Sequence, residues 1–544
     1  MLAAPFANAA NFTVTSLADS GSGSLRDVVA AAASGDSITI SATGTLTLTS
    51  GEIPVTKALT ITGPGSSALT ISGGGVSRIF KVSVTTSGAA DAPLTLSGVT
   101  LANGYATGTC PAPSTGSGGA IAATESLSLT DVAITSSYAA RNGGGLAWAL
   151  RRSGQSLTMS NVRIVGNSAG CPSATAGGVG GGLFAGYDTS VTSSATGTLS
   201  LTSVSALGNS AQRHGGGAAF AGPLTISGSG TRFNGNMART GHGGAIYLAA
   251  PSVSTVGTPG LSLATSELSN NIASLSGGAV AASNLASAQQ ASGSRASVSL
   301  TNSTVSGNLV QSASGNAAAA SLAGNVSLTL NNCTVAQNDV AASSRGASIV
   351  RSRCTVTAEP LATLTSTIVA MTNSSNSAYN DLADDGSAFS NSWIANNSLV
   401  QRTNATLSGA GNLTSVDPLL AGLAWNGSST RSHALASSSP ALNAGSNVLA
   451  LSTDQRGQAR VFGTAADIGA YEATLTATSA VGCGFDLDGD GSLLATTDGL
   501  MLARIMLGYG GDAVTSGAIN TAGSRPDWAS VKSYLNTNCG FSLP

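Results

Sequence analysis

The chain has 544 residues and a formal net charge of −2; 8% of its residues are charged, 4% are aromatic, 42% are hydrophobic, and 70 are glycine. This charge gives no electrostatic basis for binding nucleic acid or an anionic membrane, and the apolar fraction argues against a disordered chain. So few charges are unusual for a cytosolic enzyme. They suit an extracellular β-solenoid, which grows along one axis and escapes the usual size limit of a compact domain.

Residues 1–10 are apolar and end in Ala-Asn-Ala-Ala, which resembles the last part of a signal peptide and its small-residue cleavage site. We expect these residues to be the remnant of a signal peptide. The protein would then be secreted, or displayed on a bacterial cell surface. No apolar run reaches about 18 residues, so no transmembrane helix is expected.

Residues 11–93 predict an N-terminal cap and the first coils. A strand starts at Phe12, and a helix capped by Ser24 and ended by Gly35 should cover the open edge of the first coil. The run Thr-Ser-Leu-Ala-Asp-Ser-Gly-Ser-Gly-Ser-Leu-Arg, followed by Gly-Asp-Ser-Ile-Thr-Ile, is similar to the cap of CSLREA-type surface β-helices. In that family this part is structural.

Residues 94–373 repeat one pattern nine times, in copies that start 25 to 42 residues apart. This spread favours a β-solenoid, because its corners vary in length while its strands do not. We expect three short parallel strands in each coil, with apolar residues on one face and Ser, Thr and Asn on the other. The copies open at Leu94, Leu127, Leu157, Leu199, Leu224, Leu261, Val298, Leu328 and Leu364.

Two features recur at fixed places in these copies. An asparagine follows the second strand, and stacked amides there could bond the coils above and below. Glycine blocks such as Gly243-Gly-Ala-Ile mark bends that leave no room for a Cβ. The asparagines are Asn167, Asn209, Asn236, Asn271, Asn308 and Asn338. The Gly-Gly-Ala-Ile and Phe-x-x-Asn elements resemble those of polymorphic outer membrane proteins, which are right-handed parallel β-helices.

Residues 374–472 carry five short motifs in a fixed order, from Asp417-Pro-Leu-Leu to Asp467-Ile-Gly-Ala-Tyr-Glu. They resemble the closing region of choice-of-anchor Q proteins, which are secreted β-helices. We therefore expect these residues to form the last coils, so that one right-handed parallel β-helix spans residues 36–472. Asp454, Arg456 and Asp467 are expected to be buried polar pairs rather than a catalytic cluster.

The six cysteines suggest disulfides in a chain of this kind. Of the 15 ways to form three pairs, we favour the one that joins cysteines at matching places in the coils or at the two ends of the last module. The predicted pairs are Cys110–Cys171, Cys333–Cys354 and Cys483–Cys539. A metal site is the weaker interpretation, because no CxxC motif or histidine cluster accompanies them.

Residues 473–482 form a small-residue linker before a module at 483–544. Asp486, Asp488 and Asp490 stand at positions 1, 3 and 5 of an EF-hand-like loop, and Ser492 stands at position 7, which offers its carbonyl. Asp498 starts a helix that Gly508 ends, and it is the acidic residue that could close the loop. These five residues, from Asp486 to Asp498, are the predicted Ca²⁺ ligands.

This loop resembles that of dockerins but is one residue longer, with Thr497 where the closing Glu is usual. The resemblance implies one structural Ca²⁺. The second half, Gly517 to Cys539, has a helix but no second calcium loop, so a protein partner such as a cohesin stays open. The expected fold is all-β: a right-handed parallel β-helix with a short capping helix and a small helical, dockerin-like module.

Parallel β-helices also carry polysaccharide lyases and hydrolases, so we looked for catalytic groups. Gly241-His242-Gly243 resembles a hydrolase motif, but the Asp384-Asp385 pair follows it instead of preceding it. His214 and His242 should stack on neighbouring coils, either as turn histidines or as a weak metal or sugar site. Trp148, Phe220 and Tyr247 are expected to stack in the core, with a sugar-binding strip as the alternative.

Two functions follow. The first is an adhesin-like structural protein that binds extracellular polysaccharide, cell-surface glycan or another surface through hydroxyl and amide ladders. The alternative is a polysaccharide lyase or glycoside hydrolase on a pectate-lyase-like β-helix. The carboxylates fall mainly in the caps and the calcium loop, which favours the first, without catalytic residues.

Overall fold

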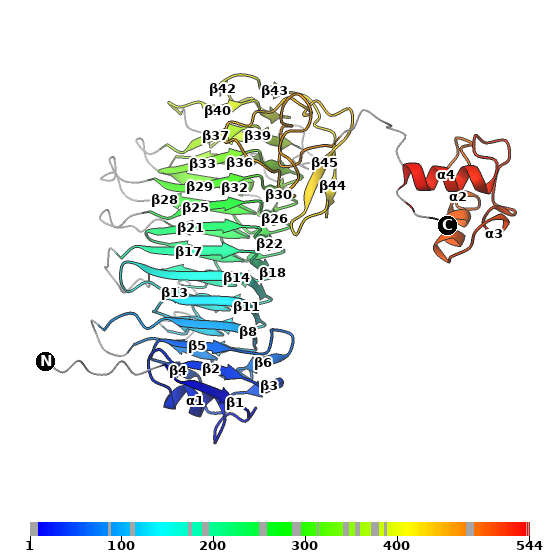
Figure 1. Ribbon diagram of the computed structural model, residues 1–544. Coiled ribbons are helices and arrows are strands. Elements are labelled where there is room, and N and C mark those ends of the chain that lie inside the picture. The colour runs from blue at the N-terminus through cyan, green and yellow to red at the C-terminus, as the bar shows by residue number, and fades with distance from the viewer. Residues whose placement is uncertain are drawn as a thin grey trace. The chain divides into compact units, whose positions relative to one another are not determined.

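The computed structural model describes residues 9–539, 541 and 543, except 85–88, 109–114, 172–176, 188–194, 250–257, 285–294, 313–314, 341–346, 354–358, 371–379, 386–388 and 475–483. The chain divides into two compact units, Met1–Ala473 and Thr474–Pro544. The first unit is a parallel β-helix with strands stacked rung upon rung (Figure 1), as predicted. Among the described residues, no helix is long and apolar enough to cross a membrane.

The rungs build four stacks of parallel strands. The first two stacks belong to one 24-stranded sheet and share the long strands β8, β11 and β14, which run through both. The first stack contains β1 (Asn11–Val14), β2 (Ser37–Ile40), β5 (Leu59–Thr62), β8 (Leu94–Ala102), β11 (Leu127–Thr135), β14 (Gln155–Val165), β17 (Gly197–Thr202), β21 (Leu224–Ser229), β25 (Gly260–Ala264), β29 (Ala296–Thr301), β33 (Val326–Asn331), β37 (Leu361–Thr365), β40 (Trp393–Asn396) and β42 (Leu407–Ser408). The second adds β3 (Gly44–Thr47), β6 (Leu69–Ser72), β18 (Ser205–Leu207), β22 (Arg232–Asn234), β26 (Glu267–Ser269), β30 (Thr304–Ser306), β34 (Thr334–Ala336), β38 (Ile368–Ala370), β41 (Leu399–Val400) and β43 (Leu413–Thr414).

The other two stacks complete each rung. The third contains β9 (Tyr105–Ala106), β12 (Tyr138–Ala139), β15 (Ser168–Ala169), β19 (Ser210–Ala211), β23 (Met237–Ala238), β27 (Ile272–Ala273), β31 (Leu309–Val310) and β35 (Asp339–Val340). The fourth contains β4 (Ile53–Val55), β7 (Phe80–Val82), β10 (Ile121–Ala123), β13 (Leu146–Ala149), β16 (Leu183–Gly186), β20 (Ala218–Ala221), β24 (Ile246–Ala249), β28 (Val280–Asn284), β32 (Ala317–Gly324), β36 (Ala347–Ser352) and β39 (Asn380–Asp384). The prediction of three strands per coil missed the third stack, because two-residue strands are too short to show a period.

The core is built by residues in register along the rungs. Leu94 pairs with Leu127, which pairs with Leu157 and then Leu199, and all four are buried. Alternation along each strand points these side chains inward and the intervening hydroxyl residues outward. Each rung therefore covers the apolar face of the next, which no single rung could bury alone.

Two aromatic residues of the fourth stack lie in this core and one does not. Trp148 and Phe220 are buried, as expected. The expectation is wrong for Tyr247, because it pairs with Ala219, while Leu248 pairs with Phe220. This register points Tyr247 outward, since neighbouring residues of a strand face opposite sides.

The predicted asparagine ladder is confirmed. The side-chain oxygen of Asn236 accepts hydrogen bonds from the backbone N–H and the amide of Asn209, both at 3.0 Å. The Asn236 amide donates to the carbonyl of Ala206 and to the side-chain oxygen of Asn271, each at 2.9 Å. The same pattern links Asn167 to Asn209 and continues through Asn308 to Asn338. The buried corner is thus satisfied by a continuous column of amides.

The outer face of the first stack carries two columns of small side chains, all polar except Ala264, which we call the hydroxyl array. The first column is Ser37, Thr60, Thr95, Ser128, Thr158, Ser200, Ser227, Ser262, Ser299, Thr329 and Thr363. The second is Thr39, Thr62, Ser97, Thr130, Ser160, Thr202, Ser229, Ala264, Thr301, Asn331 and Thr365. Neighbours are about 4.8 Å apart along the axis and about 6.7 Å apart along a strand. Neither column contains a charged residue.

The glycine blocks let the backbones of adjacent rungs approach closely. A Cβ on Gly181 would lie 2.3 Å from the carbonyl oxygen of Gly216 and 2.4 Å from the carbonyl carbon of Ser210. We expect Gly181→Ala to lower the free energy of unfolding by about 3 kcal/mol, the upper range for overpacking. Gly422→Ala, which meets no atom within 4 Å, should be neutral. Denaturant unfolding of both variants checks this, and equal effects would contradict it.

The helix α1 (Leu25–Ala31) caps the N-terminal end, where Figure 1 shows it beside β1. The Ser24 side chain accepts a hydrogen bond from the backbone N–H of Asp27, as expected for the helix start. Leu25 and Val29 are buried against the first coil. The helix ends at Ala31, earlier than the stop predicted at Gly35.

The prediction that residues 374–472 form closing coils is wrong for residues 417–472. The parallel stacks end at β43, and the chain then forms an antiparallel hairpin of β44 (Leu420–Ala424) and β45 (Ser432–Leu435). This segment returns along the flank, beside earlier rungs (Figure 1). Its Thr430 donates to the carbonyl of Thr265, and its Ala470 N–H donates to Thr334. We call residues 417–473 the return segment.

The second unit contains α2 (Asp498–Met506), α3 (Asp512–Thr515) and α4 (Trp528–Asn538). Its small core is formed by residues that include Leu487, Met501 and Val531. Asp527 caps α4 by accepting from the Ser530 N–H in a capping box. Leu487 connects this core to the acidic loop, because it lies between Asp486 and Asp488.

Candidate metal centre

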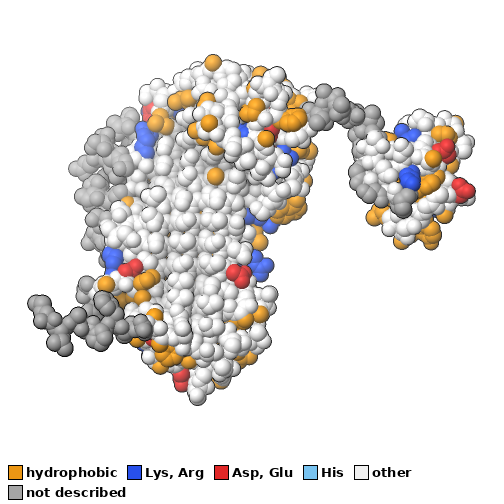
Figure 2. Space-filling model, in the orientation of Figure 1, with side chains coloured by type: hydrophobic (Ala, Val, Ile, Leu, Met, Phe, Trp, Pro, Cys, Tyr) orange, Lys and Arg blue, Asp and Glu red, His pale blue; other side chains and the backbone are white. Residues whose placement is uncertain are grey.

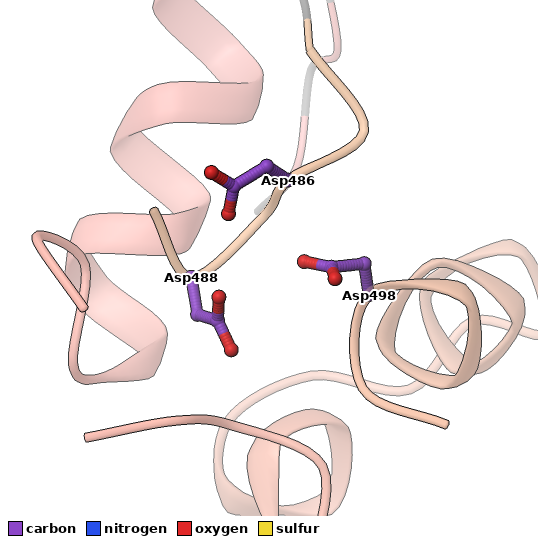
Figure 3. A group of neighbouring side chains, drawn as sticks. All are labelled: Asp486, Asp488 and Asp498. Atoms are coloured by element: carbon purple, nitrogen blue, oxygen red, sulfur yellow. The ribbon is translucent and has the colours of Figure 1, made fainter. Parts of the chain in front are cut away.

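Three carboxylates meet at the start of α2. One oxygen from each of Asp486, Asp488 and Asp498 lies within 4.8 Å of the others. Figure 3 shows Asp486 and Asp488 on the loop and Asp498 at the start of a helix, with their side chains converging. The loop supplies two ligands two residues apart, and the helix supplies the third from its first turn.

Asp486 organises the loop. Its oxygens accept hydrogen bonds from the backbone N–H groups of Gly489 at 2.6 Å, Asp490 at 3.1 Å and Gly491 at 3.0 Å. Gly489 and Gly491 both have positive φ, which glycine adopts without strain. The chain therefore wraps around this carboxylate, and the oxygen that accepts only from Gly491 keeps a further lone pair for a cation.

Asp498 joins the loop to α2. One oxygen accepts from the Leu487 N–H at 2.6 Å, and the other accepts from the Leu494 N–H at 3.1 Å and the Thr497 hydroxyl at 3.0 Å. Burial opposes ionisation of this carboxyl, but the hydrogen bonds from Leu494 and Leu487 outweigh it and lower the pKa of Asp498. Asp498 is thus held as an anion facing the cluster.

Asp488 has a buried carboxylate that is only partly satisfied by hydrogen bonds. Its side chain is fully buried, and one oxygen accepts from the Asn520 N–H at 2.8 Å. The other oxygen is buried with no hydrogen-bond partner among the described residues. Burial raises the pKa of Asp488, and the charges of Asp498 and Asp490 raise it further. A buried, unpartnered carboxylate oxygen beside two other carboxylates fits a hard divalent cation such as Ca²⁺.

The remaining predicted ligands lie differently. Asp490 accepts from the Ser492 N–H at 2.7 Å and from the side-chain amide of Asn520 at 2.8 Å, and it stands outside the group of three. A ligand role for Asp490 and for the Ser492 carbonyl stays a prediction. Asn520 was missed by the sequence analysis. Its only signal is an asparagine between two helices, 30 residues after Asp490, which no loop motif marks.

The two histidines stack on neighbouring rungs, with ring centroids 5.4 Å apart. The backbone N–H of His242 donates to Nδ1 of His214 at 3.1 Å. Burial lowers the pKa of His214 to about 3, and the charge of His242 adds to this. Gly180 and Gly215 donate their N–H groups to the carbonyls of His214 and His242. This arrangement confirms the predicted stacking of the two histidines on neighbouring coils.

The residues considered for hydrolysis do not meet. Asp384 lies in β39, four rungs from β24, which follows His242, so about 19 Å separates them along the axis. Arg351, which is fully buried, donates to both oxygens of Asp384, at 2.7 and 2.8 Å. Its guanidinium also lies over the ring of Trp393. Asp384 is therefore ion-paired with Arg351 at the end of the β-helix, while its own side chain remains 29% exposed.

The cysteines give one correction. Cys333 has a free, buried thiol, so the predicted Cys333–Cys354 disulfide is wrong. Cys333 lies at the corner between β33 and β34, where its thiol donates to the carbonyl of Asn331 at 3.3 Å. Cys354 itself lies outside the described residues.

The other two disulfides stay predictions. Cys171 and Cys539 are in the disulfide-bonded state. Their predicted partners, Cys110 and Cys483, lie outside the described residues.

No protein-family model and no curated protein matches the chain. Among solved structures, it is similar to the pectate lyase Pel9A, with 15% sequence identity, a TM-score of 0.33, and 86% of this chain and 97% of that chain covered. It is also similar to ORF18 of Geobacillus virus E2, with 10% identity, a TM-score of 0.24, and 74% of this chain and 60% of that chain covered. The fold assignment rests on the strand pairing itself.

Proposed function

We propose that the protein is a secreted or cell-surface β-helix that acts as an adhesin-like structural protein and binds glycans or other surfaces. The single observation that supports this is the hydroxyl array, an uncharged and periodic face over eleven rungs of the first stack. In Figure 2 this face carries few hydrophobic or charged side chains.

The array suits an ordered polyhydroxyl ligand for a physical reason. Each Ser or Thr hydroxyl can donate one hydrogen bond and accept others, as can the hydroxyls of a sugar. One such contact gains little, because both partners give up water to make it. A rigid row of hydroxyl side chains can make the same hydrogen bond to each repeat of a polymer, and no further side chains have to be ordered each time. The free energies of these contacts therefore add. A long or surface-bound glycan is therefore favoured over a single sugar.

The alternative of a polysaccharide lyase or hydrolase has less support. Asp384 is engaged by Arg351, and His214 is held as a neutral acceptor in a corner. We expect no turnover of polyuronates by the wild-type protein. Turnover that disappears in His242→Ala or Asp384→Asn would establish the enzyme instead.

The binding test uses the full chain on a glycan array and on insoluble polysaccharides. We expect the double variant Thr158→Glu and Ser227→Glu, at two exposed positions of the array, to reduce retention at least about tenfold. The two hydroxyl contacts are lost, and negative charge is added to an uncharged binding face. The matched control is Thr56→Glu with Ser438→Glu, two exposed positions outside the array. Equal retention of both double variants, or none by the wild type, would contradict the proposal.

For the C-terminal module, the proposal is a Ca²⁺-stabilised dockerin-like module that binds a protein partner. Asp486, Asp488 and Asp498 would hold the ion, which would neutralise their mutual repulsion. The partner role is supported by Phe485, Leu493 and Leu494, which line one hollow and are 58%, 67% and 49% exposed. Exposed apolar side chains gathered in this way are typical of protein interaction sites.

A further inference from the structure

The return segment is attached to the β-helix through polar contacts on the corner between the first and second stacks. The Thr304 hydroxyl donates to the side-chain oxygen of Gln455 at 2.6 Å, and the Gln455 amide donates to the carbonyl of Ser266 at 3.4 Å. The Gly469 N–H donates to the carbonyl of Ser366. The return segment also shares a buried apolar cluster with the rungs, in which Leu435, Ala441 and Ile468 join Ile368, Ala370 and Leu399. Both kinds of contact require the segment to keep its conformation, so the attachment depends on the interactions that maintain this conformation.

A buried ionic cluster holds that shape. Arg456 contacts Asp454 at 2.8 Å, and Arg460 lies 3.3 Å from Glu472. Arg460 also donates to the backbone carbonyl of Asp467 at 2.6 Å. Asp454, Asp467, Glu472 and Arg460 are each at most 1% exposed. Three carboxylates face two guanidiniums, so the cluster holds one negative charge too many unless a carboxyl is protonated.

Glu472 is the group that takes the proton. Its oxygens accept from the backbone N–H groups of Phe462 at 2.8 Å and Asp467 at 2.9 Å. Burial raises the pKa of Glu472 to about 7; the two hydrogen bonds and Arg460 lower it, and the charge of Asp467 raises it. Burial likewise raises the pKa of Asp467.

The surrounding groups do not compensate in the same pH range. Burial lowers the pKa of Arg460, and the charges of Glu472, Asp454 and Asp467 raise it. Arg460 is the cation that faces Glu472, because Arg456 donates to Asp454. The Cys333 thiol also faces Arg460, and burial raises its pKa to about 12, so it stays neutral. Asp467 and Arg460 are the charged groups that act on the pKa of Glu472, and the Asp454 carboxylate accepts from the backbone N–H of Glu472 at 3.0 Å.

A second contact between the return segment and the β-helix depends on pH in the opposite direction. Glu267 of the β-helix is fully buried and contacts Arg431 of the return segment at 2.6 Å and Arg232 at 3.3 Å. Burial opposes its ionisation, but the hydrogen bonds from Arg431 and Ser269 outweigh it and lower the pKa of Glu267. This contact weakens only in acid.

We propose that the return segment is a proton-dependent clasp: it is held on the flank of the β-helix while the surplus carboxyl of the buried cluster is protonated, and it loosens when that carboxyl ionises. The attached form covers the corner formed by Ser266, Asn302 and Ser366. The loosened form exposes it.

The direction follows from proton linkage. The pKa of Glu472 is raised from 4.5 in the unfolded segment to about 7 in the attached one, so the attached form binds the proton more tightly. The contribution is complete below the unfolded pKa and is lost as the pH rises through the folded pKa. The attachment equilibrium should therefore fall by about 100-fold between about pH 4.5 and about pH 7.5.

Hydrogen exchange of the full chain tests this, with exchange times scaled to the intrinsic amide rate at each pH. We expect protection of the peptide containing Gln455, Phe462 and Asp467 to fall by about 100-fold over this range, while β29 is unchanged as the internal reference. In Glu472→Gln, which keeps the shape without the charge, protection should lose most of its pH dependence, and only the smaller contribution of Asp467 should remain. In Glu267→Gln, protection should be lower throughout but should keep the wild-type pH dependence.

Two outcomes would overturn the clasp. One is a wild-type protein whose return segment is equally protected across the range. The other is a Glu472→Gln variant that keeps the wild-type pH dependence. If Glu472→Gln fails to fold, the wild-type series still decides the first outcome. Asp467→Asn then decides the second: it removes a charge that raises the pKa of Glu472, so the loss of protection should begin at a lower pH than in the wild type, and an unchanged pH dependence would overturn the clasp.

Discussion

Replacing Asp488 by asparagine should abolish calcium binding by the C-terminal module. Asp488 is fully buried and offers one oxygen with no partner among the described residues, next to Asp486 and Asp498. An EF-hand-like loop that closes with Asp rather than Glu, and with Leu494 at position 9, should bind Ca²⁺ with a Kd of about 10⁻⁴ M. Removing one of three charges should weaken binding by at least about 100-fold.

Titration calorimetry of the full chain measures this effect. Asp512→Asn is the matched control, because this exposed acid lies in the same module but outside the cluster. We expect the control to bind like the wild type. Absence of calcium heat in the wild type, or the same heat in Asp488→Asn, would end the idea of a calcium site.

Removal of calcium should loosen the module and leave the β-helix intact. At a Ca²⁺ concentration about 100 times the Kd, binding stabilises the folded module by about 2.7 kcal/mol. In thermal unfolding with and without chelator, only the transition of the module should therefore move.

Protons should compete with Ca²⁺, because the pKa of Asp488 is raised by burial and by the charges of Asp498 and Asp490. The affinity for Ca²⁺ should therefore fall as the pH is lowered towards this pKa.

Replacing Asn236 by leucine should be the most damaging single change in the β-helix. The change would leave the buried backbone N–H of Asn209 without its acceptor. It would also remove three further hydrogen bonds, those from the Asn209 amide and those that the Asn236 amide donates to Ala206 and Asn271. A buried polar group that loses its partner costs about 1–3 kcal/mol, so the expected loss is about 4 kcal/mol. Denaturant unfolding measures it, with Ser227→Ala on the outer face as a control expected within about 0.5 kcal/mol.

The position in the ladder should matter as well. Among the described residues, Asn338 has one ladder neighbour, Asn308, and it donates to the carbonyls of Val305 and Ala336. Asn338→Leu should therefore cost less than Asn236→Leu. Equal costs would mean that the ladder does not act through its neighbours.

The sequence by itself determined the features that repeat or are local. Period-two alternation defined the strands, and because each rung meets a near copy of itself, the same alternation determined that Asn236 would lie between Asn209 and Asn271. The helix start at Ser24 and the acidic loop at Asp486 are also local, since a few neighbouring backbone groups determine both.

Only the tertiary structure decided what depends on distant partners. Nothing near residue 430 indicates that the chain turns back to meet Thr265, because that contact joins segments 165 residues apart. Tyr247 faces outward because the strand register pairs it with Ala219, while its neighbour Leu248 pairs with Phe220. Cys333 lies in a corner between two strands, which its distance from Cys354 in the sequence does not reveal. Asn520 joins the acidic loop from another segment of the module. Such contacts are selected by packing and by the pairing of buried charges, which have no period and leave no signal in the chain before it folds.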